Sequence, residues 1–191
     1  MPDYAPRWEL TQMLATRGTG LFARVDAAEE ALCMRLNRGC RNAAVRDMFK
    51  VVSRLGDGVF WYILLLLLPV LFGERALRPA VVMAATGAIG VALYKVLKHR
   101  LVRERPFVTF AGISAASVPL DRYSFPSGHT LHAVSFTVIA TSQFPVLGWI
   151  LVPFAVLVAG SRVVLGLHYP TDVLAGALIG ASLAGGALAL I

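Results

Sequence analysis

The chain has 191 residues, of which 57% are hydrophobic and only 15% are charged. Soluble domains carry about 25% charged residues and less apolar content, so this composition excludes an ordinary soluble domain and indicates a membrane protein. The formal net charge is +7. Nucleic acid is not the expected partner, because the basic residues sit beside apolar segments, where they suit anionic lipid and phosphate better.

The N-terminal part of the chain has an amphipathic pattern. Over residues 21–54, apolar side chains such as Leu32 and Leu36 recur at helical spacing among basic ones such as Arg35. This pattern predicts amphipathic helix that lies on the membrane surface rather than crossing it. We therefore expect residues 1–54 to form an N-terminal interfacial region.

The rest of the chain is dominated by apolar stretches. A membrane-spanning helix needs about 20 mostly apolar residues. Five stretches approach that length: 58–72, 79–97, 130–144, 145–165 and 172–191. The last contains Gly176 and Gly180 at a spacing that permits close helix packing in lipid. The sequence predicts an all-α integral membrane bundle of about five transmembrane helices, forming one membrane domain over residues 1–191 with its transmembrane bundle at 55–191.

Five spans would bring three polar clusters to one face of the membrane. The N-terminus, residues 98–129 and the junction between the fourth and fifth spans would share that face. Residues 73–78 and the C-terminus would lie on the other. Only Arg75 and Arg78 of the 18 basic residues fall on that second side. The positive-inside rule then predicts that the clusters face the cytoplasm.

The first and third clusters combine cations with a histidine and a carboxylate. Lys98 and Arg105 follow the second span, although basic residues also collect at helix ends for topological reasons alone. Arg162 lies at the end of a strongly apolar run, where an ionisable residue usually has a function. His168 and Asp172 are four residues apart, so the carboxylate can orient one ring nitrogen and leave the other to attack.

The second cluster, Pro126 to His129, resembles the start of a helix. Pro126 suits the first helical position, with Ser124 as the capping residue. Unpaired backbone N–H groups around Gly128 would then form an anion site, to which the glycine allows close approach. His129 could donate a proton to an oxygen that leaves such an anion. An ordinary cap beside an interfacial histidine is the alternative for this stretch alone.

Together the clusters read K-x6-R-P, P-S-G-H and S-R-x5-H-x3-D between Lys98 and Asp172. This order strongly resembles the signature of the type 2 phosphatidic acid phosphatase family of membrane lipid phosphatases. The resemblance implies a phosphohistidine at His168, oriented by Asp172, with His129 as the general acid. The residues that it implies around the phosphate are Lys98, Arg105, Ser127, Gly128 and Arg162. No metal or other cofactor is expected, because three cations already neutralise the phosphate.

The resemblance implies a membrane lipid phosphate as substrate and the lipid bilayer as partner. Undecaprenyl diphosphate ranks first and phosphatidylglycerophosphate second, with phosphatidic acid or another lipid-linked phosphate as alternatives. A vanadate-type haloperoxidase resembles the same motifs, but a site that faces lipid suits a lipid substrate. A small transporter or scaffold with structurally paired arginines is the non-enzymatic alternative. The expected location is the bacterial inner membrane.

The two cysteines and the two remaining histidines match none of these motifs. Cys33 and Cys40 have no zinc-like spacing and are expected to be free thiols. His132 lies one helical turn from His129, which leaves a metal-binding pair as a minor alternative.

Overall fold

A computed structural model describes residues 21–119 and 121–191 of the chain, and within these ranges it contains helices but no strand. The all-α prediction is confirmed. The elements are α2 (Leu21–Asn37), η1 (Arg38–Arg41), α3 (Ala43–Arg54), η2 (Leu55–Val59), α4 (Phe60–Phe72), η3 (Glu74–Ala76), α5 (Leu77–Leu101), α6 (Pro106–Thr109), α7 (Gly128–Gln143), η4 (Pro145–Leu147), α8 (Gly148–Val164) and α9 (Pro170–Leu188). The first 20 residues of the expected interfacial region lie outside the described part.

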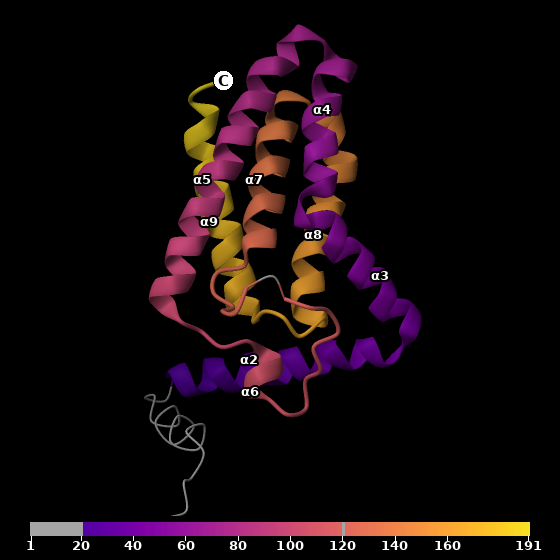
Figure 1. Ribbon diagram of the computed structural model, residues 1–191, viewed down its shortest axis with the longest axis vertical. Coiled ribbons are helices and arrows are strands. Elements are labelled where there is room, and N and C mark those ends of the chain that lie inside the picture. The colour runs from indigo at the N-terminus through magenta and orange to yellow at the C-terminus, as the bar shows by residue number, and fades with distance from the viewer. Residues whose placement is uncertain (1–20, 120) are drawn as a thin grey trace, which may run out of the picture.

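Helices α4, α5, α7, α8 and α9 run side by side as a bundle (Figure 1), and they correspond to the five predicted apolar stretches. Helix α7 lies in the middle, packed against α5, α8 and α9. Three helical stretches are long and apolar enough to cross a membrane: Ala43–Thr109, Pro145–Val164 and Pro170–Leu188. The first of them turns back on itself and holds both α4 and α5, whereas α7 is shorter, with 16 residues.

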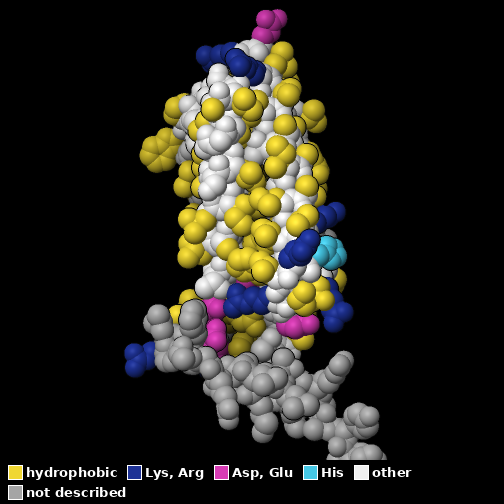
Figure 2. All heavy atoms as spheres, turned by 90° about the vertical axis from the view of Figure 1, so that its left-hand side faces the viewer, with side chains coloured by type: hydrophobic (Ala, Val, Ile, Leu, Met, Phe, Trp, Pro, Cys, Tyr) yellow, Lys and Arg dark blue, Asp and Glu magenta, His cyan; other side chains and the backbone are white. Residues whose placement is uncertain are grey.

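The outer surface of the bundle is apolar between two charged ends. On the side formed by α5 and α9, hydrophobic side chains cover the long axis, and charged side chains gather at the extremities (Figure 2). Val81, Ile89, Leu174 and Leu178 are among the large apolar residues exposed there. Such a belt matches the hydrocarbon layer of a bilayer, and the chain is a membrane protein.

Helices α7 and α9 touch along a glycine face. A Cβ atom at Gly176 would lie 2.5 Å from the carbonyl oxygen of Ser127, and one at Gly180 would overlap that of Leu131. The predicted close packing at these glycines is therefore confirmed. The contact also lets the Ser127 N–H donate to the Asp172 carbonyl at 3.1 Å, which fixes the start of α7 beside the start of α9.

The sequence predicted amphipathic helix on the membrane surface over residues 21–54, and the structure divides this stretch into two helices of different direction, α2 and α3. Helix α2 lies across the lower end of the bundle, but α3 slopes upward into α4 (Figure 1). Helix α3 takes this course because Phe49 and Val52 pack against the apolar clusters of the bundle, and α3 contacts α8. Of these two helices, α2 has the orientation of an interfacial helix.

Helix α2 is fastened to the bundle by one buried carboxylate. Glu29 Oε1 accepts hydrogen bonds from the backbone N–H and the hydroxyl of Thr171, at 2.8 and 2.6 Å. Its Oε2 accepts from Arg103 Nη2 at 2.7 Å. Burial favours the neutral acid, but the bonds from Thr171 and Arg103 outweigh burial and lower the pKa of Glu29 below its ordinary 4.5. Cys33, on the same helix, is buried and free, as expected.

The glycine contact can be tested with a methyl group. We expect Gly180→Ala to destabilise the protein by about 1–3 kcal/mol, because the added methyl meets a backbone carbonyl that cannot move aside. Gly185→Ala is the matched control, since a Cβ there meets no heavy atom within 4 Å. Thermal unfolding in detergent measures both variants. A Gly180→Ala protein as stable as the control would contradict the packing of α9 on α7.

Removal of the Glu29 charge gives a pH-dependent effect. The folded pKa is lowered, so the ionised form stabilises the fold fully above pH 4.5, and this stabilisation is lost as the pH falls through the folded value. We expect Glu29→Gln to cost about 1–2 kcal/mol at pH 7. The difference from the wild type should shrink below pH 4.5. Glu30→Gln, at the neighbouring carboxylate, is the control, and a pH-independent difference would contradict the assignment.

Candidate active site

A cavity of about 510 Å³ opens at the lower end of the bundle. One part of its wall is polar, and most of its residues come from the three sequence clusters. The residues there are Lys98, Arg105, Asp121, Gly128, His129, Arg162 and His168. The other part is apolar and lies between α4 and α5, with Trp61, Tyr62, Leu65, Ala84, Ala88 and Val91. The cavity therefore joins a charged end to an apolar slot.

The structure brings together most of the residues that the sequence singled out. Ser127 is the exception among the expected phosphate ligands. Its side chain is fully buried, and its hydroxyl lies 3.0 Å from the Thr130 hydroxyl instead of lining the cavity. Asp172 also lies behind the wall, where its carboxylate can reach His168 but not a bound phosphate.

Helix α7 starts two residues later than the sequence predicted. Ser127 is the N-cap, and Pro126 precedes it rather than occupying the first turn. Ser124 is not the cap, because its hydroxyl donates to the carbonyls of Arg103 and Glu104 at 3.2 and 3.1 Å. Gly128 thus stands at the first turn and lines the cavity, where backbone N–H groups have no carbonyl of their own helix to bond. The helix N-terminus that the sequence proposed as an anion site therefore lies at the cavity wall.

His168 lies in the loop between α8 and α9 and is 1% exposed. Its Nδ1 is 3.6 Å from Asp172 Oδ2, which is longer than a hydrogen bond, while its Nε2 is 3.3 Å from Arg105 Nη1. Burial disfavours a charged ring, and the neighbouring arginines repel it, so the pKa of His168 lies well below 6.5. The ring is therefore neutral at pH 7 and has the lone pair that a nucleophile needs.

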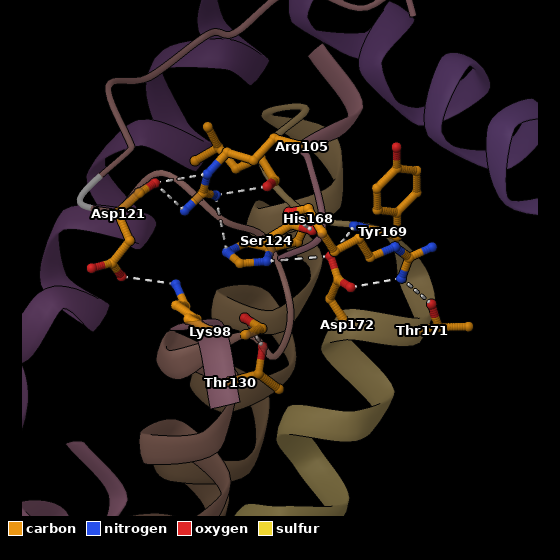
Figure 3. Close-up of polar contacts among 12 residues, drawn as sticks. Lys98, Arg105, Asp121, Ser124, Thr130, His168, Tyr169, Thr171 and Asp172 are labelled. Atoms are coloured by element: carbon orange, nitrogen blue, oxygen red, sulfur yellow. Dashed lines mark hydrogen bonds and ion pairs between the residues drawn. The ribbon is translucent and has the colours of Figure 1, made fainter. Parts of the chain in front are cut away.

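Two hydrogen-bond donors hold the Asp172 carboxylate in place (Figure 3). Its Oδ1 accepts from Arg103 Nη1 at 2.7 Å, and its Oδ2 accepts from the Tyr169 N–H at 2.9 Å. The Arg103 guanidinium also stacks on the Tyr169 ring at 3.9 Å. These contacts fix the position of the Asp172 carboxylate, so that it can orient His168.

The cations of the site are positioned largely by neutral groups. Arg105 donates to the carbonyl oxygens of Leu167 and Asp121, at 2.7 Å and 2.8–3.0 Å. Arg162 Nη1 donates to the Ser53 hydroxyl. Its buried Nε has no hydrogen-bond partner within the described part of the chain. Among the described residues, Lys98 is the one of these three cations with a carboxylate partner, Asp121 Oδ2 at 2.8 Å, so positive charge remains to bind an anion.

Four residues of the site escaped the sequence reasoning, and one of them is Asp121, which binds Lys98. Arg103 and Glu29 surround Asp172 and Thr171, as described above. Asp57 lies in η2, lines the cavity and contacts Nε2 of His129. The sequence could have indicated Asp57, because it is an ionisable residue at the start of the apolar stretch 58–72. The same argument singled out Arg162.

The residues present do not form an evident metal site. His132 Nδ1 lies 2.9 Å from the Gly128 carbonyl and its Nε2 lies 3.1 Å from that of Gly87, so this ring is engaged by backbone and does not pair with His129. Over residues 21–119 and 121–191, no group of three or more His, Cys, Asp or Glu side chains could hold a metal ion.

Comparisons with known proteins agree with this geometry. An undecaprenyl-diphosphatase from Sulfolobus acidocaldarius is 32% identical over 140 residues, which are 72% of this chain and 66% of the relative. The undecaprenyl-diphosphatase BcrC from Bacillus subtilis is 35% identical over 125 residues, or 65% of this chain and 64% of the relative. The chain thus spans about two thirds of the length of each.

A solved structure shares the fold. The crystal structure of a transmembrane PAP2-type phosphatidylglycerolphosphate phosphatase from Bacillus subtilis matches with a TM-score of 0.73 and 27% sequence identity, covering 96% of this chain and 93% of that one. The family model of the PAP2 superfamily matches residues 75–191, which include all three motif segments around the cavity. The chain belongs to the PAP2 superfamily.

Proposed function

We propose that the protein is an integral membrane phosphatase that hydrolyses a lipid phosphomonoester or diphosphate through a phosphohistidine at His168. The observation that carries the proposal is the cavity, in which a neutral, buried histidine lies beside three cations and an apolar slot. The charged end suits a phosphate, and the slot between α4 and α5 suits the first part of a lipid tail.

The reaction would proceed in two steps. Nε2 of His168 attacks phosphorus while the bond to the leaving oxygen breaks, and His129 gives that oxygen a proton. Water then attacks the phosphohistidine, His129 takes a proton from it, and phosphate leaves. Lys98, Arg105 and Arg162 stabilise the equatorial oxygens, where charge develops in both transition states. Asp172 stabilises the positive ring of His168.

The substrate that we propose first is undecaprenyl diphosphate, with phosphatidylglycerophosphate second. The two curated relatives described above are named undecaprenyl-diphosphatases, and the solved neighbour is titled a phosphatidylglycerolphosphate phosphatase. Both lipids place a phosphate at headgroup level above a long apolar tail, which the two-part cavity can take. Phosphate release from a panel of these lipids and phosphatidic acid distinguishes them.

Loss of the nucleophile should abolish turnover. We expect His168→Ala to lower kcat by about 10⁴-fold or more while the protein still folds and inserts. Asp172→Asn should lose less, because it orients the ring and does not attack. Phosphate release from detergent-solubilised protein measures both, with thermal unfolding as the folding control. The assay should proceed in chelator and be inhibited by vanadate. Near-native release by His168→Ala, or release that requires added metal, would contradict the mechanism.

We propose that the lower end of the bundle, with the cavity, faces the cytoplasm and that the membrane is the bacterial inner membrane. Two of the 18 basic residues, Arg75 and Arg78, lie at the opposite end, where α4 turns into α5. This asymmetry follows the positive-inside rule. Lys98, Arg105 and Arg162 have a chemical reason for their position, but most of the remaining basic residues do not.

Thiol labelling tests this orientation. Val118 is 88% exposed in the loop at the cavity end, and Val146 is 63% exposed at the other end. We expect a membrane-impermeant thiol reagent to label Val146→Cys in intact cells, and Val118→Cys only after the inner membrane is opened. Cys33 and Cys40 are replaced first, although burial already raises the pKa of the Cys33 thiol to about 12. The reverse labelling pattern would place the site outside.

A further inference from the structure

We propose that Asp57 is a positioning residue that holds His129 as the proton donor for poor leaving groups. This role rests on the proposed phosphatase function. It gives the cavity a second histidine–carboxylate pair, His129 with Asp57, in addition to His168 with Asp172. Both histidines line the cavity, so both pairs lie beside the space where a phosphate would bind.

The local backbone is built to place Asp57 in the cavity. It lies in η2, a single π-helical turn between α3 and α4, with glycine on either side. A Cβ at Gly56 would lie 2.9 Å from Val158 Cγ1 of α8, so only glycine lets the turn pack this closely. Gly58 has φ = 132°, a conformation that L side chains rarely adopt. These two requirements turn the intervening carboxylate toward α7, where it meets His129.

The cations around His129 disfavour a charged imidazole, and the Asp57 carboxylate can offset them. The other charged groups that line the cavity with it are Lys98 from α5, Arg105 and Asp121 from the following loop, and Arg162 from α8. Asp121 is already paired with Lys98 at 2.8 Å. An imidazolium at His129 would therefore face an excess of positive charge, and Asp57 is the carboxylate that contacts the ring and can offset it.

The proton transfer balances with Asp57 unchanged. A charged imidazole carries one proton on each ring nitrogen, and a carboxylate at Nε2 leaves the Nδ1 proton for the leaving oxygen. As the phosphorus–oxygen bond breaks and the bond to His168 forms, that proton moves to the departing oxygen, and His129 becomes neutral. In the second step His129 regains a proton from the attacking water, and Asp57 again stabilises the charged ring.

The rate gain from proton donation by His129 must depend on the leaving group. A lipid monophosphate expels an alkoxide, which is a strong base and needs the proton in the transition state. A lipid diphosphate expels a phosphate monoester, which is a stable anion and needs it much less. Asp57 would thus extend the activity of the site from diphosphates to monophosphates.

Farnesyl phosphate and farnesyl diphosphate provide a test with the same tail and different leaving groups. We expect Asp57→Asn to lower kcat on farnesyl phosphate by about 100-fold, the scale of general acid catalysis, and on the diphosphate by less than about 5-fold. His129→Ala should show the same selective loss. Asp47→Asn, at an exposed carboxylate of α3 that pairs with Arg46, is the control and should change neither rate.

The ratio of the two rates is the readout, because partial misfolding lowers both rates equally and leaves the ratio unchanged. If Asp57→Asn does not fold, Asp57→Glu keeps the charge and should retain activity on the monophosphate. Equal losses on the two substrates, no loss on farnesyl phosphate, or a wild type that cleaves only the diphosphate would each overturn the role of Asp57. A wild type that releases phosphate from neither lipid would instead overturn the proposed function.

Discussion

The buried residue Asp172 connects α9 to the start of α7 and to the loop after α5. Its backbone carbonyl accepts the bond that fixes the start of α7, and its side chain binds Arg103 from the loop after α5. Arg103 in turn binds Glu29 of α2. Helix α2 is therefore linked to Asp172, the neighbour of His168, through two ion pairs that share Arg103. A shift of α2 would disturb the buried carboxylates of these pairs.

The motifs predicted the location of the site well, because they consist of charged and polar residues that a phosphate site requires, and most of these residues line one cavity. The apolar stretches likewise predicted α4, α5, α7, α8 and α9, since length and hydropathy alone define a span. The partners of Asp172 could not be predicted in this way. Glu29 and Arg103 are 74 residues apart, and any of several carboxylates could have paired with that arginine. The pairing depends on how α2 crosses the bundle, which hydrophobic periodicity does not specify.

Two local errors have a similar origin. The start of α7 was expected at Pro126, from residue preferences alone, but the Ser127 N–H is taken by a carbonyl of α9, and the helix begins after it. Helix α3 was expected on the membrane surface because it is amphipathic. The same apolar face can bind a neighbouring helix equally well, and in the fold it packs against α8. In both cases a tertiary contact decided between two conformations that the sequence allowed.

The ion pair between Lys98 and Asp121 bears on how product leaves the site. A cavity with this much positive charge would bind free phosphate tightly, and release of product would then limit turnover. Asp121 provides an internal anion that competes for Lys98 when the phosphate is no longer attached to a lipid. Its backbone carbonyl holds Arg105 as well, so one short loop contacts two of the three cations. In the proposed reaction, the Asp121 carboxylate would lower the net positive charge that a departing phosphate leaves behind.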